Sequence, residues 1–211
     1  MIKSMFKVSY VFASLLLMSA WGSEAYGQSE FRTAEEATGL EVGTYVSGFE
    51  AVDQHGDKFS LNEALKSGPV VVVFYRGEWC PLCNNHLSQL QDSLSYVQKR
   101  GANVVAISPE KPEFLIQTAE KTRAGFSLLH DNDYRISDLF DVSFRPSDRE
   151  IKGLKTMLGA DLKNAHSDQS QRLPIPATFI IDRDGQIVWR HFDPDYRARS
   201  NVSDILDHLP E

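Results

Sequence analysis

Apolar residues are grouped along the chain in continuous runs and at helical spacings. Two runs rich in valine and isoleucine, "PVVVVFY" at 69–75 and "ANVVAIS" at 102–108, are typical of strands buried on both faces. "FSLLHD" at 126–131 predicts a third strand. "ATFIID" at 177–182 and "QIVWRH" at 186–191 predict two more, and the "RDG" between them is a strong hairpin signal.

Helices are predicted between and after these strands. Apolar residues recur at helical spacing from Leu82 to Val97, and the basic residues before Gly101 suit the end of a helix. The other predicted helices are 63–67, capped by Asn62 and ended by Gly68, 111–123 with Pro112 in its first turn, 134–140 and 201–209.

The order of these elements predicts the fold class. Strands alternate with helices three times before the hairpin and the final helix, and such a chain forms parallel strands with helical crossovers. We therefore expect a three-layer α/β sandwich around a central sheet. The polar stretch 145–173 does not fit this order and carries weak helical periodicity from Ile151 to Leu162. A connection this long is usually functional. We expect it to be a helical insertion over the sheet edge near the site.

The N-terminus differs in character from the rest of the chain. Two early lysines precede an apolar run at 8–21, which is short for a transmembrane helix. Small residues follow at Ala25 and Gly27, the positions that a cleavage site before Gln28 requires. This pattern predicts a signal peptide over 1–27 and a periplasmic or secreted protein. An uncleaved N-terminal anchor is the alternative.

Length and charge limit the remaining possibilities. The chain has 211 residues, enough for one domain with a sizeable core. We expect that domain at 41–211, after a polar tether at 28–40. Removing residues 1–27, which hold two lysines and one glutamate, changes the net charge from -7 to -8. This negative charge argues against a nucleic-acid partner. The run at 8–21 is not followed by a cysteine, so we expect no stable membrane association after cleavage.

Both cysteines of the chain lie in "FYRGEWCPLCNNHL" at 74–87, as Cys80 and Cys83. A disulfide between them would close a very small loop and restrain the unfolded chain little, which argues against a purely structural bridge. The pair lies between a predicted strand and a predicted helix. Unpaired N–H groups at a helix N-terminus stabilise a thiolate there. Cys-x-x-Cys in this setting is a redox signal.

Metal binding is the main alternative for the two cysteines. A structural zinc site needs four ligands, and only two cysteines are available. His86 lies on the same helical face as Cys83 and would give a partial site, although a lone histidine on a helix is usually a surface residue. Asn84 stands where covalent haem attachment requires histidine. We therefore expect no metal and no organic cofactor.

Four stretches carry a resemblance to a known family. They are "LEVG…F…DQHGDKFSL", "VVVFYRGEWCPLCNNHL", "IPATFIIDRDGQIVW" and "DPDYRARSNVSDIL", which together span about residue 40 to the C-terminus. The chain resembles the peroxiredoxin-like branch of the alkyl hydroperoxide reductase/thiol-specific antioxidant family. The resemblance implies a thioredoxin-like fold with a central mixed sheet and a thiol-based redox activity.

Two versions of the active site compete within this resemblance. In the thioredoxin version, Cys80 attacks and Cys83 resolves. In the peroxiredoxin motif Pro-x-x-x-Thr/Ser-x-x-Cys, Arg76 falls at the proline, Cys80 at the hydroxyl residue and Cys83 at the peroxide-reacting cysteine. We expect Cys80 to attack, because it is first in the turn, where exposure to solvent and to the unpaired N–H groups should be greatest.

Three further residues are expected to support the cysteines. Pro176 stands where peroxiredoxins that resemble this hairpin carry an arginine. It resembles the cis-proline of thioredoxins, and the alternative is an ordinary proline at a strand start. Arg76 is a candidate for the missing positive charge, or else a solvated arginine. Trp79 is expected to shield the thiolate. Glu78 is a candidate proton relay, or else simply exposed.

The expected function is an exported peroxiredoxin-like thiol oxidoreductase. A thiolate attacks a peroxide, the resulting sulfenic acid condenses with the second thiol, and a thioredoxin-type or other thiol reductant restores the pair. Two alternatives stay open. One is a thiol–disulfide oxidoreductase that acts on protein disulfides. The other is a copper-handling protein that uses Cys80, Cys83 and a histidine.

Overall fold

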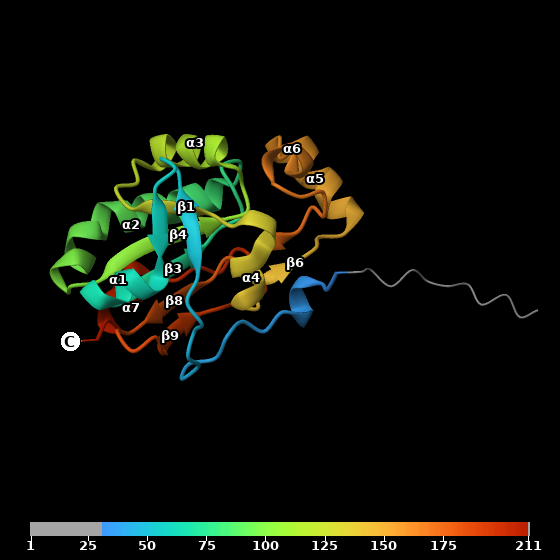
Figure 1. Ribbon diagram of the computed structural model, residues 1–211. Helices are drawn as coiled ribbons and strands as arrows, with labels where there is room; N and C mark the ends of the chain where they lie inside the picture. Colours follow the sequence, from blue (N-terminus) through green and yellow to red (C-terminus); the bar gives the residue numbers. More distant parts are fainter. Residues whose placement is uncertain (1–30, 211) are drawn as a thin grey trace, which may run out of the picture. The chain divides into compact units, whose positions relative to one another are not determined.

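The computed structural model describes residues 31–210, which form an α/β domain around a seven-stranded sheet (Figure 1). The strand order is β2-β1-β5-β4-β3-β8-β9. Strands β3, β4 and β5 are parallel, while every other neighbouring pair is antiparallel, so the sheet is mixed as expected. The bounds are β1 Glu50–Asp53, β2 Lys58–Ser60, β3 Val70–Phe74, β4 Asn103–Ser108, β5 Ser127–His130, β8 Thr178–Ile181 and β9 Ile187–His191.

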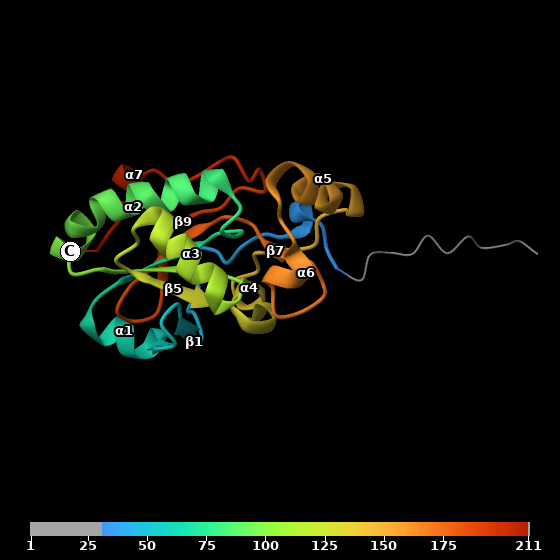
Figure 2. The same cartoon turned by 90° about the horizontal axis from the view of Figure 1, so that it is seen from above.

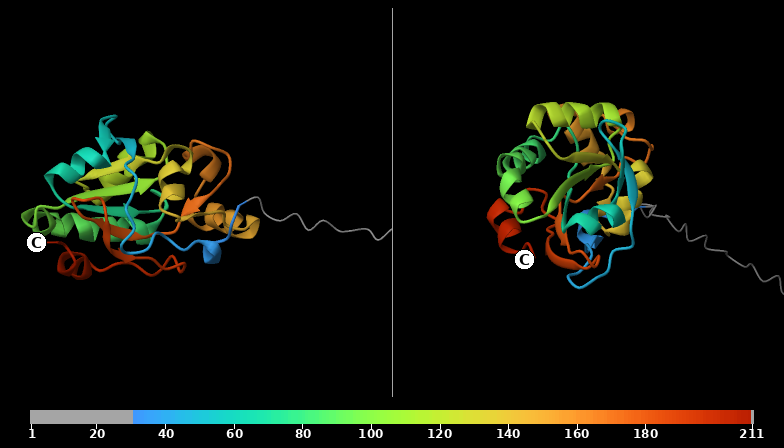
Figure 3. Two further views of the ribbon diagram at one scale, coloured as in Figure 1. Left: turned by 60° about the horizontal axis from the view of Figure 1, so that its bottom comes forward. Right: turned by 60° about the vertical axis from the view of Figure 1, so that its left-hand side comes forward.

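Helices cover both faces of the sheet (Figures 2 and 3). Their bounds are α1 Leu61–Ser67, α2 Pro81–Lys99, α3 Pro112–Thr122, α4 Arg135–Leu139, α5 Asp148–Leu158, α6 Leu162–Ala165 and α7 Val202–Asp207, with short 3₁₀ turns at Ala34–Glu36 and Asn132–Tyr134. No helix in the described part of the chain is long and apolar enough to cross a membrane.

The valine run of β3 explains why the sheet is buried on both sides. Successive side chains of a strand point to opposite faces. Val71 and Val73 pack in the cluster that contains Leu87 of α2, whereas Val70 and Val72 pack in a second cluster with α1 and α4. The three-layer sandwich is therefore confirmed, with a separate apolar core on each side of the sheet.

The segment 31–40 differs from the expected tether, because it is held against the domain. The guanidinium of Arg32 pairs with the carboxylate of Asp141, and its Nε donates to the Ser143 carbonyl oxygen at 2.6 Å. Ala37 is buried in the core cluster that includes α1. The polar composition of residues 31–40 gives no indication of these specific contacts. The predicted signal peptide and residues 28–30 lie outside the described residues.

Two boundaries also differ from the sequence expectations. Helix α1 begins at Leu61 with Ser60 as its N-cap, so Asn62 lies inside the helix. The insertion contains α5 and α6 and is flanked by a two-stranded sheet of β6 (Ser143–Phe144) and β7 (Leu173–Pro174). It pairs with the segment after the central strand β4, through a bridge between Glu110 and His166. The insertion is therefore placed near the end of a central strand rather than over the sheet edge.

Candidate active site

The two cysteines lie at the N-terminus of α2, as the sequence predicted. Strand β3 ends at Phe74, and Cys80 is the N-cap of the helix that begins with Pro81. The Cys83 backbone N–H donates to the Cys80 Sγ at 3.3 Å. A sulfur in this position satisfies one of the unpaired N–H groups that every helix N-terminus exposes.

Cys80 and Cys83 are joined as a disulfide, with their Cα atoms 5.2 Å apart. Both residues are buried, with exposed fractions of 0% and 1%. This differs from the expectation that Cys80 would be exposed. Arg76 of the loop and Arg199 of the segment before α7 lie against the two sulfurs.

Arg76 is buried beside the disulfide rather than solvated. Only 5% of the residue is exposed, and its Nη2 donates to the Cys80 Sγ at 3.4 Å. Its guanidinium carbon lies 4.2 Å from the centre of the Tyr196 ring and 5.1 Å from that of Trp79. Burial lowers the pKa of Arg76 to about 10, so the side chain stays charged at neutral pH. Within residues 31–210 it makes no ion pair with a carboxylate.

Trp79 and Glu78 line the same loop. The half-buried Trp79 ring packs against the core cluster of α2 and against a small cluster of the insertion, which ties α5 to the cysteine loop. Glu78 is ion-paired with Lys121 and is not the free exposed glutamate that the sequence suggested. Trp79 packs against the cluster that contains Cys80 and Cys83, and shielding of the thiolate stays a prediction.

Glu110 is a buried carboxyl group that the sequence analysis did not select. Its Oε2 accepts a hydrogen bond from the Glu78 backbone N–H at 2.7 Å, while its Oε1 is buried with no partner among the described residues. Burial raises its pKa well above the usual range. Burial and the charge of Glu110 likewise raise the pKa of Tyr75. A Cβ on Gly77 would lie 2.4 Å from Glu110 Oε1, so no side chain fits at that point of the loop.

A second group that the sequence analysis did not select lies beside the sulfur of Cys83. Arg199 Nη2 lies 3.8 Å from the Cys83 Sγ. The neighbouring Ser200 is buried and bonds His86 Nε2 at 3.2 Å. His86 is only 5% exposed, so it is not the surface histidine that the helix position suggested. The stretch "DPDYRARS" marked the family resemblance, but nothing in its composition identified which arginine reaches a sulfur.

Pro176 is buried and is separated from the start of β8 by Ala177, whose carbonyl oxygen accepts a hydrogen bond from the Phe74 backbone N–H at 2.8 Å. It therefore lies beside the end of the strand that leads into the cysteine loop. No peptide bond between residues 31 and 210 is cis. Pro176 lacks the cis geometry of the thioredoxin proline that it resembles, and its role in supporting the cysteines stays a prediction.

The described residues bring together no group of three or more histidine, cysteine, aspartate or glutamate side chains suited to a metal. The ring of His86 is bonded to Ser200. The copper-handling alternative therefore gains no support from the geometry around Cys80 and Cys83.

His86 leads to a prediction about stability and pH. Burial, followed by the charges of Arg199 and His191, lowers its pKa to about 4. In the unfolded chain, His86 binds a proton below its ordinary pKa of about 6.5. In the folded chain, it stays neutral until the pH approaches 4. His86 therefore costs stability as pH falls through that interval. His86→Gln, which keeps a polar partner for Ser200, is expected to flatten the fall by about 1 kcal/mol per pH unit.

The measurement for this prediction is urea unfolding of both proteins at several pH values from 7 to 5. Buried carboxyl groups such as Glu110 are present in both proteins, so their contribution is removed by the comparison. Parallel pH profiles for wild type and His86→Gln would show that His86 titrates normally.

One hollow lies next to the candidate site. A groove of about 320 Å³ borders it, between the start of α2 and the insertion, and is lined by Arg76, Pro81, Leu82, Gly153, Leu154, Met157, Leu158 and Tyr196. Several of these apolar side chains are exposed, including 82% of Met157 and 43% of Leu82. The groove therefore joins an apolar surface to the arginine that contacts Cys80.

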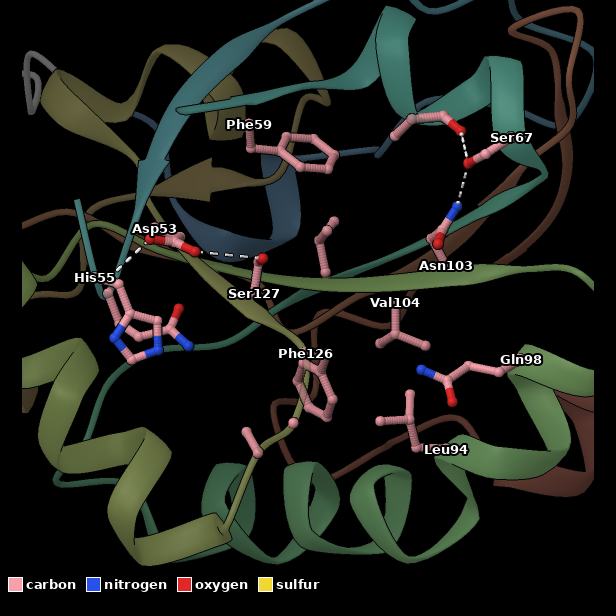
Figure 4. A pocket seen from close by; sticks show the side chains of 15 residues that line it. Asp53, His55, Phe59, Ser67, Leu94, Gln98, Asn103, Val104, Phe126 and Ser127 are labelled. Carbon is pink, nitrogen blue, oxygen red and sulfur yellow. Dashed lines mark hydrogen bonds between the residues drawn. The ribbon is translucent and has the colours of Figure 1, made fainter. Parts of the chain in front are cut away.

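A second hollow, of about 440 Å³, lies elsewhere (Figure 4). It is bordered by Asn103 at the start of β4 and by Ser127 at the start of β5. The cysteines follow the opposite, carboxyl end of the parallel strand β3. This hollow contains neither cysteine in its lining and is not part of the candidate site.

Known proteins share this arrangement of sheet and helices. A solved structure of peroxidoxin BcpB from Mycobacterium tuberculosis superposes with a TM-score of 0.63 at 23% identity, over 81% of this chain and 96% of that one. A Xanthomonas campestris bacterioferritin comigratory protein, described for its alkyl peroxide reduction activity, gives a TM-score of 0.55 at 18% identity, over 75% of this chain and 85% of that one. At these identities the likeness shows the thioredoxin-like fold of peroxiredoxins.

Sequence relatives agree with the fold. Peroxiredoxin Bcp of Escherichia coli (strain K12) is 28% identical over 172 residues, which cover 82% of this chain and 97% of the relative. Peroxiredoxin Bcp of Bacillus subtilis (strain 168) is 23% identical over 174 residues, covering 82% and 96%. The family model described as AhpC/TSA matches residues 42–190, which include both cysteines and the β8–β9 hairpin. The chain belongs to the AhpC/TSA family.

Proposed function

We propose that this protein is a thiol peroxidase in which Cys80 is the attacking residue and Cys83 resolves. The observation that carries the proposal is the environment of the Cys80 sulfur, which receives hydrogen bonds from the Arg76 guanidinium and the Cys83 backbone N–H. A cation and a helix N-terminus both lower the pKa of a thiol. Among the described residues, the Cys83 sulfur has only a longer polar contact, to Arg199.

The reaction follows from this arrangement. The Cys80 thiolate attacks one peroxide oxygen, the O–O bond breaks, and the departing alkoxide takes a proton to leave as an alcohol or as water. The Cys80 sulfenic acid then condenses with the Cys83 thiol, which releases water and forms the disulfide. A dithiol reductant reduces that disulfide through a mixed disulfide and becomes oxidised in turn.

The apolar groove favours organic peroxides as substrates. Its lining joins Leu82, Leu154 and Met157 to Arg76, so an alkyl group in the groove would direct a peroxide toward the charged side of the disulfide. Burial of an alkyl chain contributes about 0.8 kcal/mol per methylene. The Xanthomonas campestris relative, described for alkyl peroxide reduction, supports the same substrate class.

The test is steady-state peroxide consumption with thioredoxin and its reductase as the electron source, beside reduction of insulin disulfides. We expect turnover of cumene hydroperoxide and a lower KM for it than for hydrogen peroxide. Reduction of insulin without any peroxide turnover would replace this proposal with the second candidate.

That second candidate is thiol–disulfide exchange with protein substrates, and Pro176 favours it. A proline stands there in place of the arginine that the family resemblance leads one to expect. The burial of both sulfurs argues the other way, because a protein disulfide needs direct access to the attacking thiolate.

Export is part of the proposal. It is supported by the basic start, the apolar run at 8–21 and the small residues Ala25 and Gly27. We expect the protein from its native host to begin near Gln28 and to fractionate with the periplasm or the medium. Intact-mass measurement checks this. Cytosolic protein that retains the residues before Gln28 would contradict it.

A further inference from the structure

Each sulfur of the disulfide has its own arginine, and the two arginines come from distant parts of the chain. Arg76 belongs to the cysteine loop and contacts Cys80, whereas Arg199 approaches Cys83 from the segment before α7. Within residues 31–210, neither guanidinium makes an ion pair with a carboxylate. Two positive charges therefore flank a neutral disulfide.

Buried hydrogen bonds hold Arg199 in this position. The neighbouring Ser200 bonds Thr178 of β8 at 2.9 Å and His86 of α2 at 3.2 Å. His86 lies one helical turn after Cys83, so the pair Arg199–Ser200 contacts two successive turns of the helix. Arg199 Nη1 also donates to the Ala198 carbonyl oxygen at 2.8 Å, which holds the side chain against its own backbone segment.

We propose that Arg199 is the catalytic counter-cation of Cys83 and that Ser200 and His86 are positioning residues that hold it there. The inference rests on the thiol chemistry of the proposed function and adds a role for the second cysteine. Burial alone would keep the Cys83 thiol protonated. A guanidinium 3.8 Å from the sulfur opposes that effect and favours the thiolate.

The role of Arg199 is clearest when the disulfide is reduced. A thiolate of the reductant attacks the Cys80 sulfur and forms a mixed disulfide with it. The Cys80–Cys83 bond breaks, and its electron pair remains on Cys83 as a thiolate. Arg199 stabilises that negative charge as it develops. The second thiol of the reductant then attacks the reductant sulfur that is bonded to Cys80. This step releases Cys80 and leaves the reductant as a disulfide.

The two arginines also affect the redox equilibrium. Two like charges beside one disulfide repel each other, and burial and then the charge of Arg76 lower the pKa of Arg199 to about 10. Thiolates between them relieve this repulsion, whereas a neutral disulfide does not. Arg199 therefore stabilises the reduced form and makes the disulfide easier to reduce.

The experiment measures each thiol separately, with no peroxide present. In the Cys80→Ser background, Arg199→Met is expected to raise the apparent pKa of Cys83 by about one unit and to slow its alkylation by iodoacetamide about tenfold below that pKa. In the Cys83→Ser background, the same change should leave Cys80 nearly unaffected. Arg76→Met should show the opposite pattern. In the otherwise wild-type protein, Arg199→Met should shift the thiol–disulfide equilibrium about tenfold toward the disulfide.

Arg197→Met is the matched control, because Arg197 lies in the same segment with 71% of its side chain exposed. Arg199→Lys keeps the positive charge, so the pKa of Cys83 should stay partly lowered. This variant tests the role of the charge if Arg199→Met is unstable. Ser200→Ala should raise the pKa of Cys83 in the presence of Arg199 and change it little in the Arg199→Met background.

An unchanged Cys83 pKa in folded Arg199→Met or Arg199→Lys protein would overturn the inference. Equal shifts at both cysteines would do the same, because they indicate a general loss of packing. A protein with a low Cys83 pKa and no peroxide turnover would keep this inference and overturn the proposed function instead.

Discussion

Cys80→Ser is expected to lower peroxide turnover by roughly a thousandfold or more, since loss of a covalent nucleophile removes the reaction path itself. Cys83→Ser should still consume one equivalent of peroxide and then stop with Cys80 as a sulfenic acid. The difference follows from the sulfur environments, because Cys80 receives two hydrogen bonds and lies at the helix N-terminus. Rapid-mixing measurements of a single turnover, with dimedone trapping of the sulfenic acid, distinguish the variants.

Ser88→Ala is a suitable control, because Ser88 lies on α2 and takes no part in the sulfur contacts described above. This variant should turn over peroxide normally. The assignment of Cys80 fails if dimedone labels Cys83 in the Cys80→Ser protein with a rate close to that of wild type. In that case the peroxiredoxin version of the motif, with Cys83 as the attacking residue, describes the chain.

Arg76→Met should produce the second large effect. Removal of a buried cation beside a thiolate raises the pKa of that thiol by about one to three units. We expect the pKa of Cys80 to rise accordingly and peroxide consumption at pH 7 to fall about tenfold or more. The rate should recover as the pH is raised, because the nucleophile is intact and only its ionisation has changed. A pH–rate profile of the second-order reaction measures this shift.

Two variants control the Arg76 result. Arg76→Lys keeps the charge but loses the planar group that lies over the rings of Tyr196 and Trp79, so partial activity is expected. Arg183→Met removes an exposed arginine from the β8–β9 turn and should change nothing. A loss of activity that is equal at all pH values would mean that Arg76 acts by positioning the substrate rather than by stabilising the thiolate.

Local sequence patterns predicted most of the sheet, because its central strands are strongly enriched in apolar and β-branched residues. The valine run of β3 has to be buried on both faces wherever it lies, and a Gly-containing turn between two apolar runs specifies the β8–β9 hairpin. The attachment of residues 31–40 was missed for the opposite reason. It depends on Arg32 meeting Asp141, more than a hundred positions away, and no local pattern records such a pair.

Only the part of the candidate site that lies close together in the sequence could be predicted. Arg76, Cys80 and Cys83 lie within eight residues of one another, in the loop before α2 and its first turn, so their proximity follows from sequence distance alone. Glu110 and Arg199 reach the loop from the end of another strand and from the segment before the last helix. Their roles depend on burial, which turns an ordinary carboxyl or guanidinium into a group with a shifted pKa. Sequence composition does not reveal burial for a single polar residue.

The separation between Cys83 and Arg199 has a consequence for biosynthesis. The two residues are 116 positions apart, so the ribosome completes the cysteine loop long before it adds the arginine. On the proposed role of Arg199, the Cys83 thiol of a nascent chain lacks its cation and is a poor nucleophile. The Cys83 thiol becomes fully reactive only when the C-terminal segment has docked on α2 and β8. Until then, Cys83 of the growing chain is less prone to oxidation and to forming mixed disulfides with neighbouring proteins.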